Sequence, residues 1–408
     1  MKSNNKLKIV NDPIYGFITI PTPLIYGLIE HPFFQRLRRI TQMGMSYLVY
    51  PGAQHTRFHH ALGAMFLMQR AVQVLRSKQV EITFEEEEAL YAAILLHDIG
   101  HGPFSHAMEH SIVSGVGHEE ISLLFMKELN RQFRGKLDMA ITIFKNEYPR
   151  KFLHQLISGQ LDMDRLDYLR RDSFYTGVHE GNVNSQRLIA MLNVKDDGLV
   201  VEEKGIYSVE KFIIARRLMY WQVYLHKTSL VAEQLLLHLL KRAKELVLLG
   251  HEVPASEALS FFLKKQISLD DFTTTVLETF AELDDYDVIS AMKSWKNNED
   301  FVLSEISEML LSRKLLGIKL KNQPISEEKV QKHLHKIMQL HNLSEHEASY
   351  FVFQGSISNQ AYDMDKDTIN LIKKSGKVTD VAKASDQLNI EALSKRVVKY
   401  YICYPKRD

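Results

Sequence analysis

Histidine and aspartate side chains gather in one apolar stretch of the chain, residues 93–110. An apolar run at 93–96 leads directly to His97 and Asp98, and three further histidines follow by residue 110. A neutral imidazole is the commonest protein ligand for a metal ion, and a neighbouring carboxylate adds a hard, charged oxygen ligand. The stretch therefore predicts a site for a first-row divalent ion, with histidines left over that can transfer protons.

Two other segments offer ligands of the same kinds. His60 lies within residues 57–63, and Asp164 lies in the acidic segment at 160–168. Two imidazoles and two carboxylates around one ion leave positions open for water and a substrate oxygen, as a hydrolytic centre requires. A lone histidine is more often a packing or surface residue, but three segments together favour a metal site. The expected ligands are His60, His97, Asp98 and Asp164.

Helical periodicity dominates the elements that must position these ligands. Apolar residues recur at three- and four-residue spacing over 61–76, and a second helix is expected over 83–99. Thr83 followed by Glu86 is a capping-box pattern at the start of that second helix.

Turn residues mark other boundaries of this region. Residues 8–20 are typical of a short strand pair, and Pro103 can begin a further helix after two glycines. His106 and Glu109 would then share one face of that helix, because residues three apart lie on the same side.

The pattern in the second half alternates between β-like runs and helices. A small hairpin is expected within 192–207, followed by a long helix from near Ser208 and helical periodicity to about residue 341. The elements expected beyond Ser349 are β-like runs at 350–353 and 368–372, a hairpin turn at 375–376 and a helix around 385–395.

The length of the chain sets the number of units. A single core rarely serves 408 residues, so two or three packed units are expected. Hydrophobic residues at 45% and charged residues at 25% are ordinary for a soluble globular protein, which supports packed domains. We expect a mainly α fold with small β-hairpins: a helical core at 1–250, a helical extension at 251–345 and a small α/β lobe at 346–408.

Charge and cysteine content exclude several classes of function. Lys and Arg total 51 against 50 Asp and Glu, a net charge of +1, so no overall field favours nucleic acid or a membrane surface. The single cysteine, Cys403, excludes an intramolecular disulfide. The N-terminus has no signal-peptide pattern, and the chain has no run of about 18 apolar residues. We expect a cytoplasmic protein.

The order of these residues resembles a known family. His60, then His97 and Asp98, then Asp164 matches the H…HD…D signature of the HD-domain phosphohydrolase superfamily. Further segments are similar to its dNTP triphosphohydrolase branch, which contains the vertebrate sterile-alpha-motif and HD-domain dNTPase and its bacterial relatives. These segments lie at 11–16, 34–38, 50–53, 57–60, 97–106, 117–119 and 164–168. The 1–250 unit would then be an HD domain, without a sterile-alpha-motif module.

This resemblance implies hydrolysis of a dNTP to a deoxynucleoside and triphosphate, with one divalent ion per subunit (Mn, Fe, Mg, Zn, Ni or Co). The ion would bind an α-phosphate oxygen and stabilise the charge that develops there. His106 corresponds to the family's catalytic histidine, which protonates the departing 5′ oxygen, and Glu109 would orient it. His101 and His118 correspond to histidines that contact the phosphates.

The same resemblance implies how the substrate is held. Arg57, Arg165 and Arg216 would neutralise the triphosphate, although the best-known members carry a lysine at the position of Arg165. The residues expected around the sugar are Gln42 and Asp172, on the 3′-OH, and Tyr168 and Tyr224, which pack on the ring and favour deoxyribose. Tyr220 replaces a family histidine, so the preferred base is not predicted.

An activating nucleotide is a further implication. The positions that match its family contacts are Lys8, Asn11, Gln35 and Arg38. Glu30 stands where the family has an aspartate that reads guanine, and the alternative is that Lys8 and Arg38 are surface or interface residues. A homodimer or homotetramer is expected by the same analogy.

Two other functions stay open. A different HD-type phosphohydrolase or phosphodiesterase would act on a ribonucleotide or alarmone without preferring deoxyribose. A non-catalytic nucleotide-binding protein would lack a proton-transfer group, whereas His106, Glu109 and His118 are all present. Nucleic acid is not an expected partner, because the net charge is close to zero.

Overall fold

A short antiparallel strand pair begins the computed structural model of the protein, which describes residues 8–104, 115–364, 368–386 and 393–406. Its strands are β1 (Ile9–Asp12) and β2 (Gly16–Thr19). Asp12 Oδ1 accepts hydrogen bonds from the backbone N–H groups of Ile14 and Tyr15 at 2.9 and 3.0 Å. Gly16 closes the turn with a φ of +75°, a conformation that favours glycine. The predicted strand pair is confirmed.

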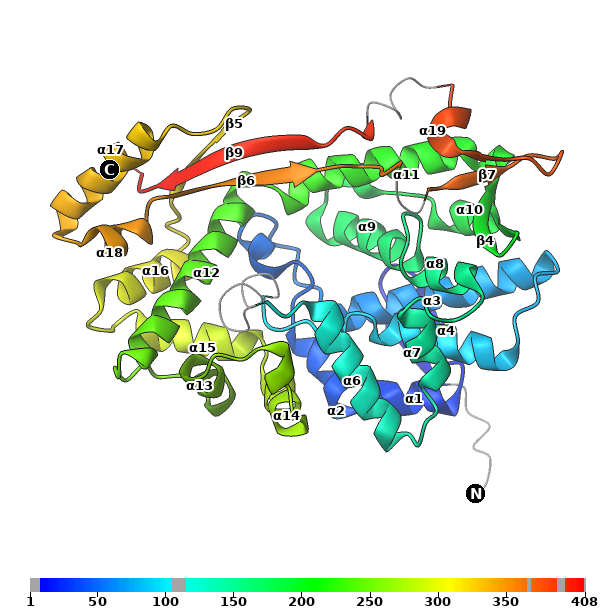
Figure 1. The fold of residues 1–408 in the computed structure, drawn as a ribbon, viewed down its shortest axis with the longest axis horizontal. Helices are drawn as coiled ribbons and strands as arrows, with labels where there is room; N and C mark the ends of the chain where they lie inside the picture. The colour runs from blue at the N-terminus through cyan, green and yellow to red at the C-terminus, as the bar shows by residue number, and fades with distance from the viewer. Residues whose placement is uncertain (1–7, 105–114, 365–367, 387–392, 407–408) are drawn as a thin grey trace.

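Helices around a long central helix form most of the first half of the chain (Figure 1). These helices are α1 (Pro23–Glu30), α2 (Pro32–Gln35), α3 (Arg57–Ser77), α4 (Phe84–Leu96), α6 (His118–Gln132), α7 (Asp138–Phe144), α8 (Lys151–Ile157), α9 (Met163–Thr176) and α10 (Ser185–Ala190). Single turns of 3-10 helix lie at η1 (Arg36–Arg39), η2 (Gly44–Leu48) and η3 (His179–Gly181). The central helix α3 packs against both α4 and α9.

Local sequence signals explain the start of α4. The Thr83 side chain accepts from the Glu86 backbone N–H, and the Glu86 carboxylate accepts from the Thr83 backbone N–H at 3.0 Å. This reciprocal pair satisfies backbone donors that the helix itself leaves free. The predicted capping box is confirmed, and α3 contains the predicted helix at 61–76.

The second half continues with further helices, among them the long helix α12, which packs against α13 and α16. Its helices are α11 (Ile206–Met219), α12 (Lys227–Leu248), α13 (Glu257–Lys264), α14 (Thr274–Glu282), α15 (Asp285–Trp295), α16 (Phe301–Leu311), α17 (Glu327–His341), α18 (Glu345–Ser349) and α19 (Val381–Ala384). Shorter turns are η4 (Glu203–Gly205), a π-helical turn η5 (Tyr220–Tyr224) and η6 (Leu269–Asp271).

Two small sheets join parts of the chain that are distant in sequence. The first has the order β3 (Leu192–Lys195), β4 (Gly198–Glu202), β7 (Asn370–Ile372) and β8 (Val378–Asp380), and β4 pairs with β7 in parallel. The second has the order β5 (Gly317–Lys321), β9 (Val397–Tyr404) and β6 (Phe353–Asn359). Figure 1 shows β6 and β9 along one edge of a mainly helical molecule, so the predicted fold class is confirmed.

Three local predictions differ from the structure or fall outside it. Pro103 and Phe104 form a turn, with a φ of +46° at Phe104, so no helix begins at Pro103. The β-like run at 350–353 contributes only Phe353 to β6, because the backbone N–H groups of residues 351 and 352 donate to the Ala348 carbonyl at the end of α18. The helix expected around 385–395 falls largely on residues outside the described part of the chain.

None of the described helices has the character of a membrane span. Among the residues that the structure describes, no helix combines the length and the apolar character that crossing a bilayer requires.

Candidate metal centre

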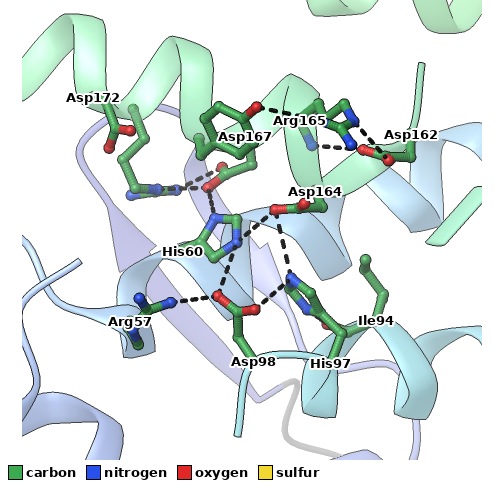
Figure 2. Close-up of polar contacts among 12 residues, drawn as sticks. Arg57, His60, Ile94, His97, Asp98, Asp162, Asp164, Arg165, Asp167 and Asp172 are labelled. Carbon is green, nitrogen blue, oxygen red and sulfur yellow. Dashed lines mark hydrogen bonds and ion pairs between the residues drawn. The ribbon is translucent and has the colours of Figure 1, made fainter. Parts of the chain in front are cut away.

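Three helices bring the four predicted metal ligands together (Figure 2). His60 lies near the start of α3, Asp164 lies in the first turn of α9, and His97 and Asp98 follow the last residue of α4. Asp164 Oδ1 is 3.0 Å from His60 Nε2 and 3.5 Å from His97 Nε2. Asp98 Oδ1 is 3.4 Å from His97 Nε2, and Asp98 Oδ2 is 3.9 Å from His60 Nε2.

The contact made by Nδ1 of each imidazole ring determines that Nε2 faces the ligand carboxylates. His60 Nδ1 lies 2.8 Å from Asp167 Oδ2, and His97 Nδ1 lies 2.6 Å from the carbonyl oxygen of Ile94. Both acceptors need an N–H donor, so each ring turns its Nε2 atom toward the two ligand carboxylates, and this nitrogen offers a lone pair to a metal when it carries no proton. Both Nε2 atoms are buried and make no well-aligned hydrogen bond within the described residues. Such converging lone pairs repel each other unless a cation lies between them, so the donor set fits a divalent metal ion.

The same contacts favour positive charge at this point. Burial lowers the pKa of His60, but its contacts with Asp164 and Asp167 outweigh burial and raise the pKa to about 10. Burial raises the pKa of Asp164, but its contacts with His60 and His97 hold that pKa below its usual range. A proton on His60 therefore compensates the carboxylate charge, and metal binding would release this proton.

A close approach of α3 and α9 supports His60 from behind. A Cβ atom on Gly63 would lie 2.1 Å from Asp167 Oδ1 and 2.2 Å from Arg171 Nη2, so only glycine leaves room for this pair. Asp167 is fully buried and accepts from Arg171 Nε at 2.8 Å and from Arg171 Nη2 at 3.0 Å. Asp167 and Arg171 were not among the predicted site residues, although an acid and an arginine four residues apart on one helix are a recognisable signal.

Residues expected to contact phosphates surround Asp98. Arg57 Nη1 donates to Asp98 Oδ2 at 2.6 Å, and His101 Nε2 lies 3.4 Å from Asp98 Oδ1. The His101 ring stacks on that of His118, with centroids 3.9 Å apart and 15° between the planes. Burial and the nearby Arg57 charge lower the pKa of His101 to about 3, so its ring is neutral at physiological pH. Asp98 thus connects the metal ligands with the candidate phosphate contacts.

A buried arginine holds the backbone of the loop that follows α4. Arg36, from η1, is fully buried and donates to the carbonyl oxygens of Ile99 and His101 at 2.8 and 2.9 Å. It also reaches the carbonyl of Leu283, at 3.4 Å. Burial lowers the pKa of Arg36 to about 9, and it still carries its charge at neutral pH. This role of Arg36 was not predictable from the sequence, because the acceptors are backbone atoms far along the chain.

An aspartate from α15 clamps the same loop further on. Asp285 Oδ1 accepts from the Phe104 backbone N–H at 3.0 Å, and its Oδ2 accepts from the backbone and hydroxyl of Thr41 at 2.8 and 2.7 Å. Asp285 therefore fixes the point from which the chain continues toward His106. The predicted catalytic pair, His106 and Glu109, lies outside the described residues.

The residues expected around a sugar gather at the other end of α9. Asp172 is buried, with Oδ1 at 2.7 Å from His55 Nε2 and Oδ2 accepting from the Tyr224 hydroxyl at 2.7 Å. Gln42 donates its backbone N–H to the His55 carbonyl at 2.9 Å. The rings of Tyr168 and Tyr224 meet edge to face, with centroids 6.0 Å apart. Contacts thus link Gln42 and Asp172 through His55, which was not predicted from the sequence, and link Tyr224 to Asp172 and Tyr168 to Tyr224.

The other two candidate triphosphate arginines lie near tyrosines. Arg165 Nε is 3.3 Å from Asp162 Oδ2, and its Nη1 donates to the Tyr168 hydroxyl at 3.4 Å (Figure 2). Asp162 therefore already compensates part of the Arg165 charge. The Arg216 guanidinium lies 6.0 Å from the ring centroid of Tyr220.

The four residues expected to contact an activating nucleotide lie in two separate segments of the chain, 8–11 and 35–38. Lys8 precedes β1 and places its Nζ 4.7 Å from the ring centroid of Tyr26, while Asn11 is exposed on β1. Arg38 Nε donates to Gln35 Oε1 at 2.8 Å. Within the described part of the chain, no hydrogen bond or ion pair joins Lys8 or Asn11 to Gln35 or Arg38.

Comparison with known families matches two consecutive regions of the chain. The HD domain family matches residues 57–172, which include all four candidate metal ligands. The HD-associated region family matches residues 183–260, which include η5 and α12.

Individual relatives cover different parts of the chain. The uncharacterised protein YwfO of Bacillus subtilis is 33% identical over 99% of this chain and 94% of its own length. Deoxynucleoside triphosphate triphosphohydrolase SAMHD1 of Danio rerio is 28% identical over 57% of this chain and 44% of that protein. The crystal structure of a phosphohydrolase from Bacteroides thetaiotaomicron has 54% identity and a TM-score of 0.95, and covers 98% of this chain and 100% of its own. This chain therefore belongs to the HD-domain phosphohydrolase family and is related to the SAMHD1 dNTP triphosphohydrolases.

Proposed function

We propose that this protein is a metal-dependent dNTP triphosphohydrolase, which converts a dNTP and water into a deoxynucleoside and triphosphate. The observation that carries the proposal is helix α9, which holds Asp164 in the metal-ligand cluster and Asp172 among the residues expected around the sugar. Eight residues separate the two carboxylates, about 12 Å along a helix axis. One rigid helix would therefore align the phosphate and sugar ends of a nucleotide, and the relationship to SAMHD1 supports a deoxynucleotide.

The described residues support the phosphate chemistry as follows. A divalent ion held by the His60, His97, Asp98 and Asp164 side chains would supply Lewis-acid stabilisation of charge on an α-phosphate oxygen. Arg57 would add a cationic donor beside Asp98, and the neutral ring of His101 would add an uncharged one. His106 is proposed to protonate the 5′ oxygen as its bond to phosphorus breaks and the water oxygen bonds to phosphorus.

Selection of deoxyribose is proposed to come from the pocket around Asp172. Both Asp172 oxygens already take part in hydrogen bonds, whereas Gln42 Oε1 is buried and makes no hydrogen bond within the described residues. Gln42 would therefore accept from the sugar 3′-OH, since a buried acceptor gains most from a new donor. The rings of Tyr168 and Tyr224 would pack against the sugar edge that carries a 2′-OH in a ribonucleotide.

The test is product analysis. The protein, loaded in turn with Mn²⁺, Fe²⁺, Mg²⁺, Zn²⁺, Ni²⁺ or Co²⁺, is incubated with each dNTP and NTP, alone and in mixtures, and the products are separated by anion exchange. We expect deoxynucleoside and intact triphosphate in equal amounts from at least one dNTP. Stepwise release of phosphate or pyrophosphate, or equal turnover of ribonucleotides, would contradict the proposal and favour another HD-type phosphohydrolase.

Two histidine substitutions, one in the metal centre and one outside it, make the test specific to the metal centre. His97→Ala removes a metal ligand and should reduce triphosphate release by roughly 10²–10³-fold, the size of the loss when one oxyanion-hole donor is removed in other enzymes. His335→Ala, an exposed position on α17, is the matched control and should leave the rate unchanged. Equal rates for both variants would contradict the proposed site.

We also propose that a nucleotide activates the enzyme and that the protein works as a homodimer or homotetramer. Lys8 and Arg38 support the proposed binding of an activating nucleotide, because both are exposed cations that a triphosphate can reach. Activity that appears only in mixtures of nucleotides, and that Arg38→Ala removes, would be the expected result. Full activity of each single dNTP would contradict the need for an activator.

A further inference from the structure

The N-terminal hairpin reaches into the core through one aspartate. Asp12 ends β1, is 7% exposed, and accepts from Arg171 Nη1 at 2.8 Å through Oδ2. Its Oδ1 holds the hairpin turn through the backbone N–H groups of Ile14 and Tyr15. One carboxylate therefore both builds the turn and binds a fully buried guanidinium on α9.

Arg171 connects Asp12 with the candidate metal centre. It binds Asp12 with one nitrogen and Asp167 with the other two, at 2.8 and 3.0 Å. Asp167 Oδ2, in turn, lies 2.8 Å from His60 Nδ1. The side chains of Asp12, Arg171, Asp167 and His60 thus form a continuous chain of charge-assisted hydrogen bonds from the hairpin to a metal ligand.

Packing leaves this chain of side chains little freedom. The side chains of His60, Asp167 and Arg171 have no exposed surface, and that of Asp12 has 3%. The Arg171 guanidinium lies 5.6 Å from the centroid of the Tyr15 ring, which itself stacks on Phe66 at 5.0 Å. Charges buried this deeply are costly to separate, so a displacement of one member is transmitted to the next.

Stability alone does not require that the hairpin be tied to this particular histidine. A hairpin can be held by apolar contacts, and β2 supplies one through the fully buried Ile18. The link to His60 is different, because the partner of the second imidazole nitrogen sets the orientation and basicity of a metal-binding ring.

We propose that Asp12 is a positioning residue for the metal centre, which acts through Arg171 and Asp167 on the ring of His60. The inference rests on the proposed metal-binding role of His60. It adds that the hairpin influences how tightly the ion is held. The hairpin also presents Asn11, so a ligand that shifts the hairpin would change the metal site along this route.

The sharpest variant is Asp12→Asn. The amide keeps an oxygen that can accept from the turn N–H groups, but it removes the negative charge opposite Arg171. Ile18→Val is the matched control, because it weakens the core contact of the same hairpin without touching the chain of hydrogen bonds. Both variants are made in the full chain, and thermal unfolding is measured for each so that their losses of stability can be compared.

Metal binding itself is the measurement. Metal-free protein is titrated with Co²⁺, and the visible d–d absorption band reports both the affinity and the ligand geometry. We expect Asp12→Asn to weaken Co²⁺ binding roughly 10-fold, at the low end of the 10–100-fold loss typical when a partner of a ligand is removed, and to alter the band. Ile18→Val should bind Co²⁺ as the unmodified protein does.

A double-mutant cycle tests the route. Asp167→Asn breaks the chain next to His60, so adding Asp12→Asn to it should weaken Co²⁺ binding no further. Fully additive effects, or equal Co²⁺ affinity and spectrum for Asp12→Asn and Ile18→Val, would overturn the inference. Failure of the unmodified protein to bind Co²⁺ or any other divalent ion would instead overturn the proposed metal function, and the two failures are therefore distinguishable.

Discussion

Gly63 on α3 lies directly against the carboxylate of Asp167 on α9, where an added Cβ atom would come within 2.1 Å of Asp167 Oδ1. The absence of a side chain lets the two helices approach closely enough for Asp167 to reach His60 Nδ1. A single glycine in the middle of a long helix therefore contributes to the geometry of the candidate metal centre. Glycine in a helix interior costs about 1 kcal/mol relative to alanine. The close approach of α3 and α9 is therefore accompanied by a lower intrinsic helix stability at this position.

Gly63→Ala should accordingly destabilise the protein, although alanine is the better helix former. Helix propensity alone would add about 1 kcal/mol, whereas overpacking against Asp167 and Arg171 costs about 1–3 kcal/mol. We expect a net loss in the free energy of unfolding, measured in urea, together with weaker metal binding. Gln73→Ala, at an exposed position of the same helix, should be close to neutral. A Gly63→Ala protein with raised stability and unchanged metal affinity would contradict the packing argument.

Divalent metal should stabilise the folded protein. The lone pairs and carboxylates around His60, His97 and Asp164 converge only in the folded state, so an ion binds that state preferentially. At a free ion concentration 100 times the Kd, the free energy of unfolding should rise by about 2.7 kcal/mol, and a chelator should reverse the change. Differential scanning calorimetry measures this shift. Asp164→Asn should lose most of it, whereas Asp270→Asn, at an exposed site in η6, should keep it.

Asp285 should be needed for both stability and turnover. Asp285→Ala leaves the buried backbone N–H groups of Thr41 and Phe104 without their acceptor. An unsatisfied buried donor costs about 1–3 kcal/mol, so we expect a loss of roughly 2 kcal/mol or more in urea unfolding. Asp285→Asn keeps one oxygen, so its free energy of unfolding should lie between those of Asp285→Ala and the unmodified protein. The turnover number should fall in the same order, and an unchanged rate in Asp285→Ala would show that the clamp has no influence on catalysis.

Glu233 should make stability depend on pH. Burial on α12 raises the pKa of Glu233 to about 7, and the carboxyl forms no hydrogen bond or ion pair with a described residue. The folded state therefore holds this proton more tightly than the unfolded state. The resulting stability is fully present below the unfolded pKa, about 4.3, and is lost as pH rises toward 7.

Glu233→Gln removes this titration and should flatten the dependence. Relative to the unmodified protein, the variant should gain stability between pH 5 and pH 8, by up to ~3 kcal/mol for a shift of this size. Urea unfolding at the two pH values measures the difference, with Glu328→Gln, an exposed position on α17, as the control. A constant difference between Glu233→Gln and the unmodified protein at both pH values would show that Glu233 does not titrate in this range.

Local structure followed from the sequence wherever its cause lies within a few residues. The capping box of Thr83 and Glu86, the N-terminal strand pair and the hairpin of β3 and β4 are all built from neighbouring residues. The strand predicted at 350–353 was wrong because the end of α18 competed for the same backbone N–H groups. That competition depends on how the preceding helix ends, which periodicity does not report.

The ligand types and their order along the chain were predictable from the sequence, because His60, the His97 and Asp98 pair, and Asp164 have the chemistry that a metal requires. The residues that support these ligands became visible in the folded protein alone. Asp167, Arg36 and Asp285 act on partners from other helices, or on backbone atoms up to 247 residues away in the case of Arg36 and the Leu283 carbonyl. The parallel pairing of β4 with β7 is likewise a long-range choice. Such contacts form when distant segments bury polar groups against each other, and no local pattern of residue types encodes which segments will meet.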